Sequence, residues 1–112
     1  MYNYKIKEVI RVYDGDTVTV VVDQGFYNTK QIKVRLGRIN TPEIRTRDLE
    51  EKKRGYIARD YLRSVIEDNK DNLTITSTGK GKYGRWIGEL FYGKTNINDE
   101  LVSLGYAEYR DY

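Results

Sequence analysis

The chain of 112 residues contains no cysteine and no histidine, and these two absences narrow its chemistry at once. Without cysteine there is no disulfide and no thiolate nucleophile, and without histidine there is no imidazole base. Zinc sites of the usual nitrogen and sulfur type are excluded as well. Catalysis by this chain would therefore depend on oxygen ligands and on arginine.

Long apolar runs are also missing from the sequence. None approaches the roughly 20 residues of a membrane-spanning helix. Residues 1–4 lead directly into strand-like sequence, without the apolar segment of a signal peptide. We therefore expect no membrane association and a cytoplasmic location unless a leader has been removed. Nothing in the sequence indicates a protein partner.

The composition is that of one globular domain spanning residues 1–112. Hydrophobic residues make up 38% and charged residues 33%, which lies outside the range of disordered chains. Twenty basic residues against 17 acidic ones give a net charge of +3, compatible with a polyanionic partner if the basic residues cluster. The eleven tyrosines suit base stacking and equally suit the core of a small barrel.

The hydrophobic pattern predicts three strands, a helix, two strands and a short helix. The strands are expected at residues 4–12, 17–23, 31–36, 73–77 and 86–92, the first with a bulge at Val9–Ile10. An apolar stripe over residues 58–66 predicts the first helix, after a polar stretch at residues 40–54. Asn96 is a good N-cap for the second helix and Gly105 a good stop. This order is expected of an α+β domain on a five-stranded OB-type β-barrel, with a helix between strands three and four and a short helix after strand five.

The fragment Asp14-Gly15-Asp16-Thr17 lies between the first two predicted strands. Asp-Gly is a strong signal for a hairpin turn, and that interpretation accounts for the fragment by itself. The alternative is that Asp16, at the mouth of a rigid β-branched strand, presents a carboxylate to Mg²⁺ or Ca²⁺ and is braced by Thr17.

A second fragment runs from Arg35 to Glu43 through Asn40-Thr41-Pro42. Arg35 is either a solvated residue on the polar face of its strand or a phosphate ligand. Thr-Pro-Glu is either the start of a helical turn or a rigid segment in which Thr41 offers its carbonyl to a metal. In the second case Glu43 would point at an attacking water molecule.

The third fragment, Lys82-Tyr83-Gly84-Arg85, is either a basic hairpin tip without a special role or part of a phosphate site. The order and spacing of the three fragments resemble those of the thermonuclease family, the staphylococcal nuclease-like domains. The family pattern is Asp-Gly-Asp-Thr after the first strand, an Arg at the end of the third, Asp-Thr-Pro-Glu beyond it and Lys-Tyr-Gly-Arg before the fifth. The resemblance covers nearly the whole chain, including residues 55–62 and 98–105.

By this resemblance the chain would be a Ca²⁺-dependent nuclease that cleaves DNA, with RNA as a second candidate substrate, and with little sequence preference. Asp16 would ligate the ion through its carboxylate and Thr41 through its carbonyl. Glu43 would orient or deprotonate the attacking water, and Arg35 and Arg85 would hold the scissile phosphate. The chemistry agrees, because a divalent ion and two guanidinium groups stabilise the charge that develops on the phosphate oxygens.

Further substrate contacts are implied by the same resemblance. Tyr83 resembles the tyrosine that contacts the other phosphate of the nucleotide, Lys82 adds general attraction, and Tyr109 and Tyr112 approximate base-stacking tyrosines. Asn40 departs from the family, which usually has a second metal-binding Asp there; its amide oxygen can coordinate a metal but carries no charge. The chain is also expected to lack the family's third, C-terminal helix.

The loss of that charge favours one alternative function, a nucleic-acid-binding or scaffold module on the same fold with weakened or lost catalysis. The four remaining residues of the implied site favour the enzyme, because a pure binding module needs no water-activating carboxylate beside its phosphate ligands. They are Asp16, Arg35, Glu43 and Arg85.

Overall fold

The computed structural model describes residues 3–81 and 84–110 of the chain. Its long strands are β1 (Asn3–Asp14), β2 (Thr17–Gly25), β3 (Asn28–Leu36), β5 (Leu73–Lys80) and β6 (Trp86–Tyr92). Three short strands are β4 (Ile39–Asn40), β7 (Thr95–Asn96) and β8 (Glu108–Tyr109). The helices are α1 (Leu49–Asp68) and α2 (Ile97–Ser103).

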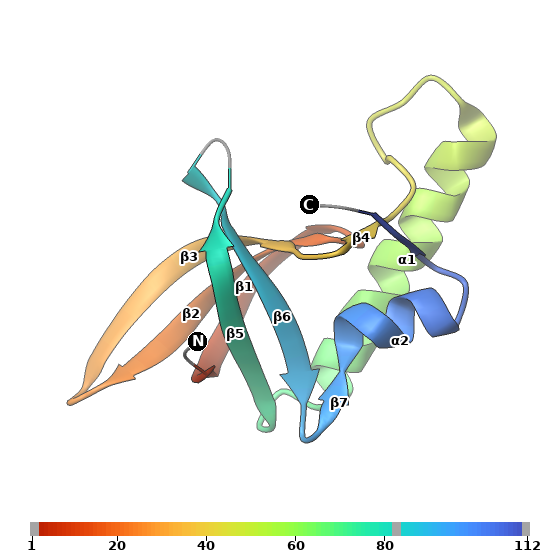
Figure 1. Cartoon of the computed structure of the whole chain (residues 1–112). Coiled ribbons are helices and arrows are strands. Elements are labelled where there is room, and N and C mark those ends of the chain that lie inside the picture. Colours follow the sequence, from red (N-terminus) through yellow and green to blue (C-terminus); the bar gives the residue numbers. More distant parts are fainter. Residues whose placement is uncertain (1–2, 82–83, 111–112) are drawn as a thin grey trace.

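The five long strands form a closed barrel. They pair in the order β3-β2-β1-β5-β6, and β3 also pairs in parallel with β6, which joins the two ends of the sheet. The pairings between neighbours in that order are antiparallel. Both helices lie on one side of the barrel (Figure 1). The predicted α+β class and five-stranded OB-type barrel are therefore confirmed.

The alternation of β2 explains where the core lies. Val18, Val20 and Val22 point inward and are almost fully buried, because successive side chains of a strand face opposite sides. The bulge predicted near Val9–Ile10 is present as a shift of register between Val9 and Arg11. Inside the barrel and under the helices these valines join a single apolar cluster, whose other members include Leu36, Ile39, Leu62, Leu73, Leu90, Ile97 and Leu101.

Helix α1 begins earlier than the apolar stripe indicated. Asp48 caps it by accepting hydrogen bonds from the backbone N–H groups of Glu50 (3.0 Å) and Glu51 (3.2 Å). Residues 49–54 precede the stripe because the first turns lie at the exposed end of the helix and bury little apolar surface. An acidic first turn after an Asp cap stabilises them by interacting with the helix dipole.

Asn96 caps α2 as predicted, accepting a hydrogen bond from Asp99 N at 3.1 Å. After α2 the chain turns at Gly105 (φ +85°) and forms β8, which pairs with β4. The pairing of Asn40 with Glu108 brings the end of the described chain beside the segment that leads into Thr41. Neither described helix is long and apolar enough to span a membrane.

Candidate active site

The connection from β1 to β2 is a tight turn, and it also fixes a buried carboxylate. The backbone N–H of Asp16 donates to Asp14 Oδ1 at 3.0 Å, and Asp14 pairs with Thr17 across the turn. A Cβ atom on Gly15 would lie 2.7 Å from Thr41 Cγ2 and 3.0 Å from Ala58 Cβ. The turn therefore packs closely against α1 and the Thr41 segment, and only glycine leaves room for that contact.

Asp16 is the centre of a buried polar network. Its Oδ2 atom accepts hydrogen bonds from the backbone N–H and the hydroxyl of Thr41, both at 3.0 Å. Its Oδ1 atom accepts from the Thr17 hydroxyl at 3.2 Å. Arg35 NH2 lies 3.2 Å from Oδ2, and the side chains of Asp16 and Arg35 are each only 9% exposed. Arg35 is thus a buried partner of Asp16 and not a solvated strand residue.

Arg35 also links Asp16 to Asn40. Its NH1 group donates to the Leu36 carbonyl at 2.7 Å and its NH2 group to Asn40 Oδ1 at 3.4 Å. The register of β2 and β3 pairs Arg35 with Thr17, so the closed barrel itself sets the approach of the guanidinium to the turn. Residues from the first and second sequence fragments therefore meet in one cluster.

The carboxylates of Asp14 and Asp16 lie close together in this cluster. Burial, followed by the neighbouring charge of Asp16, raises the pKa of Asp14 from 3.8 to about 7. Like charges so placed repel each other, and a bound cation would relieve that repulsion.

The donor atoms suit a hard cation. Among residues 3–81 and 84–110, no three His, Cys, Asp or Glu side chains gather closely enough to hold a metal by themselves. The site offers the carboxylates of Asp14 and Asp16, the amide oxygen of Asn40 and the oxygens of Thr41. An all-oxygen set of this kind fits Ca²⁺ or Mg²⁺, with fewer charges than a tight site has.

Glu43 is exposed and lies on a bent, non-helical segment between β4 and α1, so the helical turn that was one of the two alternatives for Thr-Pro-Glu is absent. Its backbone N–H donates to Glu51 Oε2 at 2.9 Å. A Cβ on Gly55 would come within 2.8 Å of the Pro42 carbonyl oxygen and 2.9 Å of that of Glu43. The first half of α1 therefore holds the Glu43 segment by direct backbone contact.

Arg85 and Glu43 line the same hollow, of about 370 Å³, together with Asp14 and Thr17. Gly81 N donates to the Arg85 carbonyl at 2.7 Å and fixes the strand end from which Arg85 extends. We call this space the arginine-lined hollow. Its remaining wall consists of Arg11, Tyr13, Lys33, Ile44, Arg45 and Arg59.

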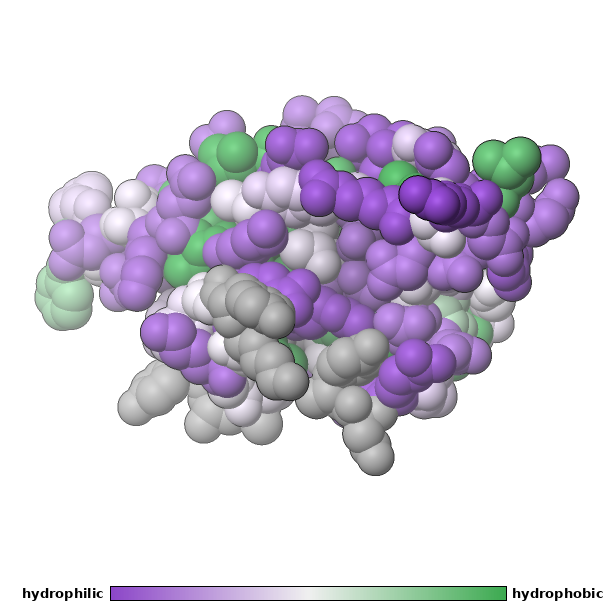
Figure 2. Space-filling view, turned by 90° about the horizontal axis from the view of Figure 1, so that it is seen from above, coloured by the Kyte–Doolittle hydropathy of each residue, from purple (hydrophilic) through white to green (hydrophobic). Residues whose placement is uncertain are grey.

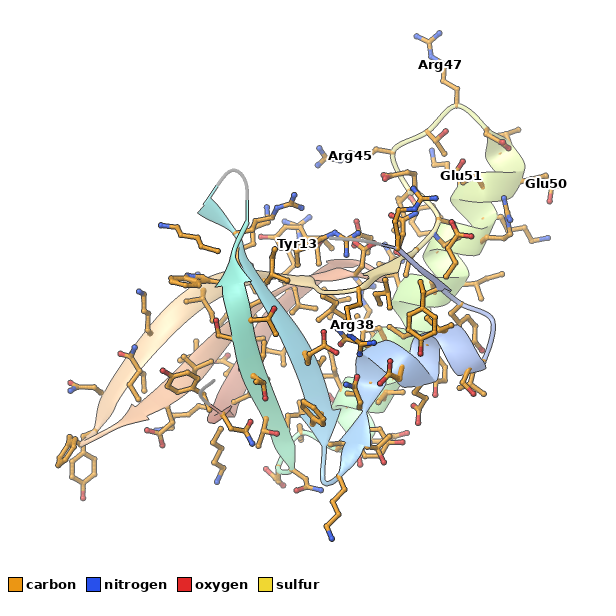
Figure 3. The ribbon with its side chains drawn as sticks, in the orientation of Figure 1. Tyr13, Arg38, Arg45, Arg47, Glu50 and Glu51 are labelled. Carbon is orange, nitrogen blue, oxygen red and sulfur yellow. The ribbon has the colours of Figure 1, made fainter. Side chains whose placement is uncertain are left out.

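A second hollow, of about 490 Å³, shares Glu43 with the first as a lining residue. Asn40, Thr41 and Arg110 are among its other lining residues. The face of the molecule above the barrel, toward which the β5–β6 hairpin and the loop before α1 extend, is mostly hydrophilic (Figure 2). Figure 3 shows Arg45 and Arg47 on that loop, with Arg47 extending away from the molecule and Arg45 extending toward the side on which the barrel lies.

The structure thus brings Asp16, Arg35, Asn40 and Thr41 into one network and places Glu43 and Arg85 on one adjoining hollow. Tyr109 lies elsewhere: its hydroxyl donates to Asp99 Oδ1 at 2.9 Å, and it lines neither hollow. Lys82, Tyr83 and Tyr112 lie outside the described residues, so their roles stay predictions.

Gly55 positions the Glu43 segment, although the hydrophobic pattern indicates it only as part of a helix. Glycine in a helix interior costs about 1 kcal/mol relative to alanine, so its presence signals a close backbone approach. The cations along the arginine-lined hollow were also missed. They come from four separate segments of the chain, and only the folded barrel brings them together.

Comparison with known proteins gives a consistent set of relatives. The family model described as staphylococcal nuclease homologue matches residues 33–112. A thermonuclease from Staphylococcus hyicus is 30% identical over 110 residues, covering 98% of this chain and 62% of the relative. An uncharacterized endonuclease from Haemophilus influenzae is 31% identical over 105 residues, covering 93% of this chain and 52% of the relative.

A third relative, the protein ParB of Escherichia coli, is 32% identical over 96 residues, covering 86% of this chain and 44% of its own length. The chain spans about half the length of these curated relatives.

Proposed function

The chain belongs to the staphylococcal nuclease family, and from this premise we propose that it is a Ca²⁺-dependent nuclease that hydrolyses phosphodiester bonds of DNA, and also of RNA, with little sequence preference. The proposal rests on one observation, namely that two groups of candidate site residues adjoin each other. The Asp16–Arg35–Asn40–Thr41 network contacts the turn that opens onto the arginine-lined hollow, where Arg85 and Glu43 lie.

Each residue has a role that its position supports. Asp16, Asn40 and Thr41 would hold the cation, which when bound supplies positive charge beside the scissile phosphate and polarises a water molecule. Glu43, exposed at the edge of both hollows, accepts the proton of the attacking water.

The two arginines act on the phosphate. Asp16 fixes the direction of Arg35, and Arg85, just before β6, lines the arginine-lined hollow. Together they bind the phosphate oxygens, on which negative charge grows during in-line attack. Contacts limited to phosphate carry no base information, which is why we expect weak sequence preference.

The alternative of a binding or scaffold module without catalysis is not favoured. Two of the relatives are described as a thermonuclease and an endonuclease. Glu43 is, moreover, an anionic side chain on a hollow that would bind an anionic polymer. A module selected only for binding gains nothing from a carboxylate at that place.

The test is to incubate the purified protein with denatured DNA, duplex DNA and RNA, in Ca²⁺ and in excess chelator. We expect Ca²⁺-dependent cleavage, with denatured DNA cut at least as fast as duplex, because an exposed backbone enters a hollow more easily. Glu43→Gln should fold normally and lose on the order of 10²-fold or more in turnover. Cleavage that survives chelation would refute the metal dependence, and intact binding without any cleavage would support the scaffold alternative.

A further inference from the structure

Two cations converge on one aromatic ring along the wall of the arginine-lined hollow. The guanidinium carbon of Arg11 and the ammonium nitrogen of Lys33 each lie 4.5 Å from the centroid of the Tyr13 ring. The Tyr13 hydroxyl accepts a hydrogen bond from Thr19 Oγ1 at 3.2 Å, which fixes the ring on the sheet. We call Arg11 and Lys33 the cation pair.

The backbone does not force these cations together. Arg11 pairs with Thr19 on β2, and Thr19 pairs with Lys33 on β3, so the two residues stand two strands apart. Two strand spacings separate their backbones by roughly 10 Å. Their charged groups nevertheless both lie 4.5 Å from the centroid of the same Tyr13 ring, although like charges repel each other.

In the part of the chain that the structure describes, no carboxylate lies within ion-pair distance of either cation. Both side chains are exposed, and neither Arg11 nor Lys33 forms an ion pair there, whereas the nearby Arg59 is paired with Asp60. A fixed pair of cations without an anionic partner is an arrangement that binds an anion, and phosphate is the anion that Arg and Lys commonly share.

The position of the cation pair indicates which phosphate of the substrate it would bind. Lys33 lies two residues before Arg35 on β3, so both side chains stand on one face of the strand. Tyr13 immediately precedes Asp14, and all three residues of the cluster line the same hollow as Glu43 and Arg85. Tyr13 lies beside the barrel end, on the side toward which Arg45 extends (Figure 3). The cluster is therefore adjacent to the proposed cleavage site and separate from it.

We infer that Arg11 and Lys33, held together by Tyr13, bind the phosphate of a nucleotide that adjoins the scissile one, so that the preferred substrate is a polynucleotide and not a dinucleotide. The inference deepens the proposed nuclease function and rests on it for its substrate. Tyr13 is a positioning residue in this arrangement, and the cation pair makes the contact.

The first test is binding, which needs no catalysis. A fluorescein-labelled oligothymidylate of about twelve nucleotides is titrated with protein in chelator over a series of NaCl concentrations. Arg11→Gln/Lys33→Gln should weaken binding roughly tenfold and reduce the slope of log Kd against log salt by about 0.7, the value for one phosphate contact on a single strand. Lys5→Gln/Lys7→Gln is the matched control, because it removes two exposed charges from β1 outside the hollow.

The second test is kinetic and uses the ratio of kcat/KM for the same oligonucleotide to that for the dinucleotide TpT. The Arg11/Lys33 double variant should lower this ratio about tenfold and the Lys5/Lys7 control should not. Tyr13→Leu should lower it in part, and Tyr13→Phe should lower it less, because the ring remains although its hydrogen bond with Thr19 is lost. Thermal unfolding of each variant verifies the fold.

Equal losses of affinity and equal slopes in the two double variants would overturn the inference, since only general attraction would then be involved. So would an unchanged kinetic ratio in the Arg11/Lys33 variant of an active enzyme. If the wild type cleaves neither substrate, the proposed nuclease function fails. The binding experiment still decides whether the cation pair contacts a phosphate of the bound strand.

Discussion

At the scale of single residues, Asp14 shows how strongly neighbours set chemistry in this site. Its pKa is raised from 3.8 to about 7, so between these values the folded chain retains a proton that the unfolded chain has released. Because the folded state binds this proton more tightly than the unfolded state, the contribution of Asp14 to the free energy of unfolding is fully present below the unfolded pKa. It is lost as the pH rises through about 7.

This predicts that the metal-free protein loses stability between about pH 4 and about pH 7, and that Asp14→Asn loses less. The amide keeps the oxygen that accepts the hydrogen bond from Asp16 N but carries no charge to be buried. Urea unfolding in excess chelator measures the effect, with the exposed Asp71→Asn as control. Parallel pH dependence of wild type and Asp14→Asn would show that Asp14 does not titrate in this range.

Asn40 supports a prediction about metal affinity. Its amide oxygen faces Arg35 in the proposed cation site, where a carboxylate would add a full negative charge. Asn40→Asp should tighten Ca²⁺ binding roughly tenfold, about 1.4 kcal/mol, and raise activity at low Ca²⁺.

Calorimetric titration of Ca²⁺ measures this affinity, with Asn28→Asp on the distant hairpin as a control for the added charge. If wild type and Asn40→Asp bind equally, Asn40 is not a metal ligand. If the affinity rises but the reaction slows, the added charge acts mainly by repelling the phosphate.

At the scale of elements, the first half of α1 positions residues of the candidate site more than it contributes to the hydrophobic core. Gly55 permits contact with the Pro42 and Glu43 carbonyls, so Gly55→Ala should displace the segment that carries Glu43. Because a misplaced catalytic group loses rate steeply, we expect turnover to fall by at least about tenfold. Lys53→Ala, on the exposed face of the same helix, is the control. Circular dichroism and nuclease rates of both variants provide the measurement, and full activity in Gly55→Ala would contradict the proposed contact.

The sequence predicted the barrel well because strand periodicity and turn residues report local structure faithfully. It predicted the ends of elements less well. The β2–β3 turn lies at Phe26 and Tyr27, both at positive φ and almost fully exposed. The turn was expected between the strands at residues 17–23 and 31–36, and it lies there, but such aromatic residues rarely adopt this conformation and the turn is shorter than expected. The strands on either side consequently extend further than their β-branched cores indicated.

The candidate site, too, could be predicted from the sequence only in part. Asp16, Arg35 and Thr41 could be found from motif spacing, because each stands at a strand end that the barrel brings together. The burial of Arg35 against Asp16 could not be predicted from the sequence, because the same residue on an open strand would be solvated. The convergence of Arg11 and Lys33 depends on cross-strand register, which hydrophobic pattern alone leaves undetermined.

At the scale of the whole molecule, charge is distributed unevenly. The net charge of the chain is only +3. Yet the arginine-lined hollow has five basic side chains against the carboxylates of Asp14 and Glu43. A concave surface on which basic groups predominate attracts a polyanion more strongly than the net charge suggests, and this attraction is screened by salt. The positions of the charges therefore matter more for binding than their sum.

The last prediction separates this general attraction from direct action on the reacting phosphate. Arg85 lines the hollow beside Glu43, whereas Lys80 is exposed at the end of β5 outside it. Arg85→Ala, and likewise Arg35→Ala, should lower turnover by on the order of 10²-fold, because each removes charge that stabilises the transition state. Lys80→Ala should leave turnover nearly unchanged and reduce only the salt dependence of binding. Steady-state kinetics at two salt concentrations distinguish the cases. Equal losses of turnover in all three variants would mean that the arginines act, like the lysine, only by attracting the polymer.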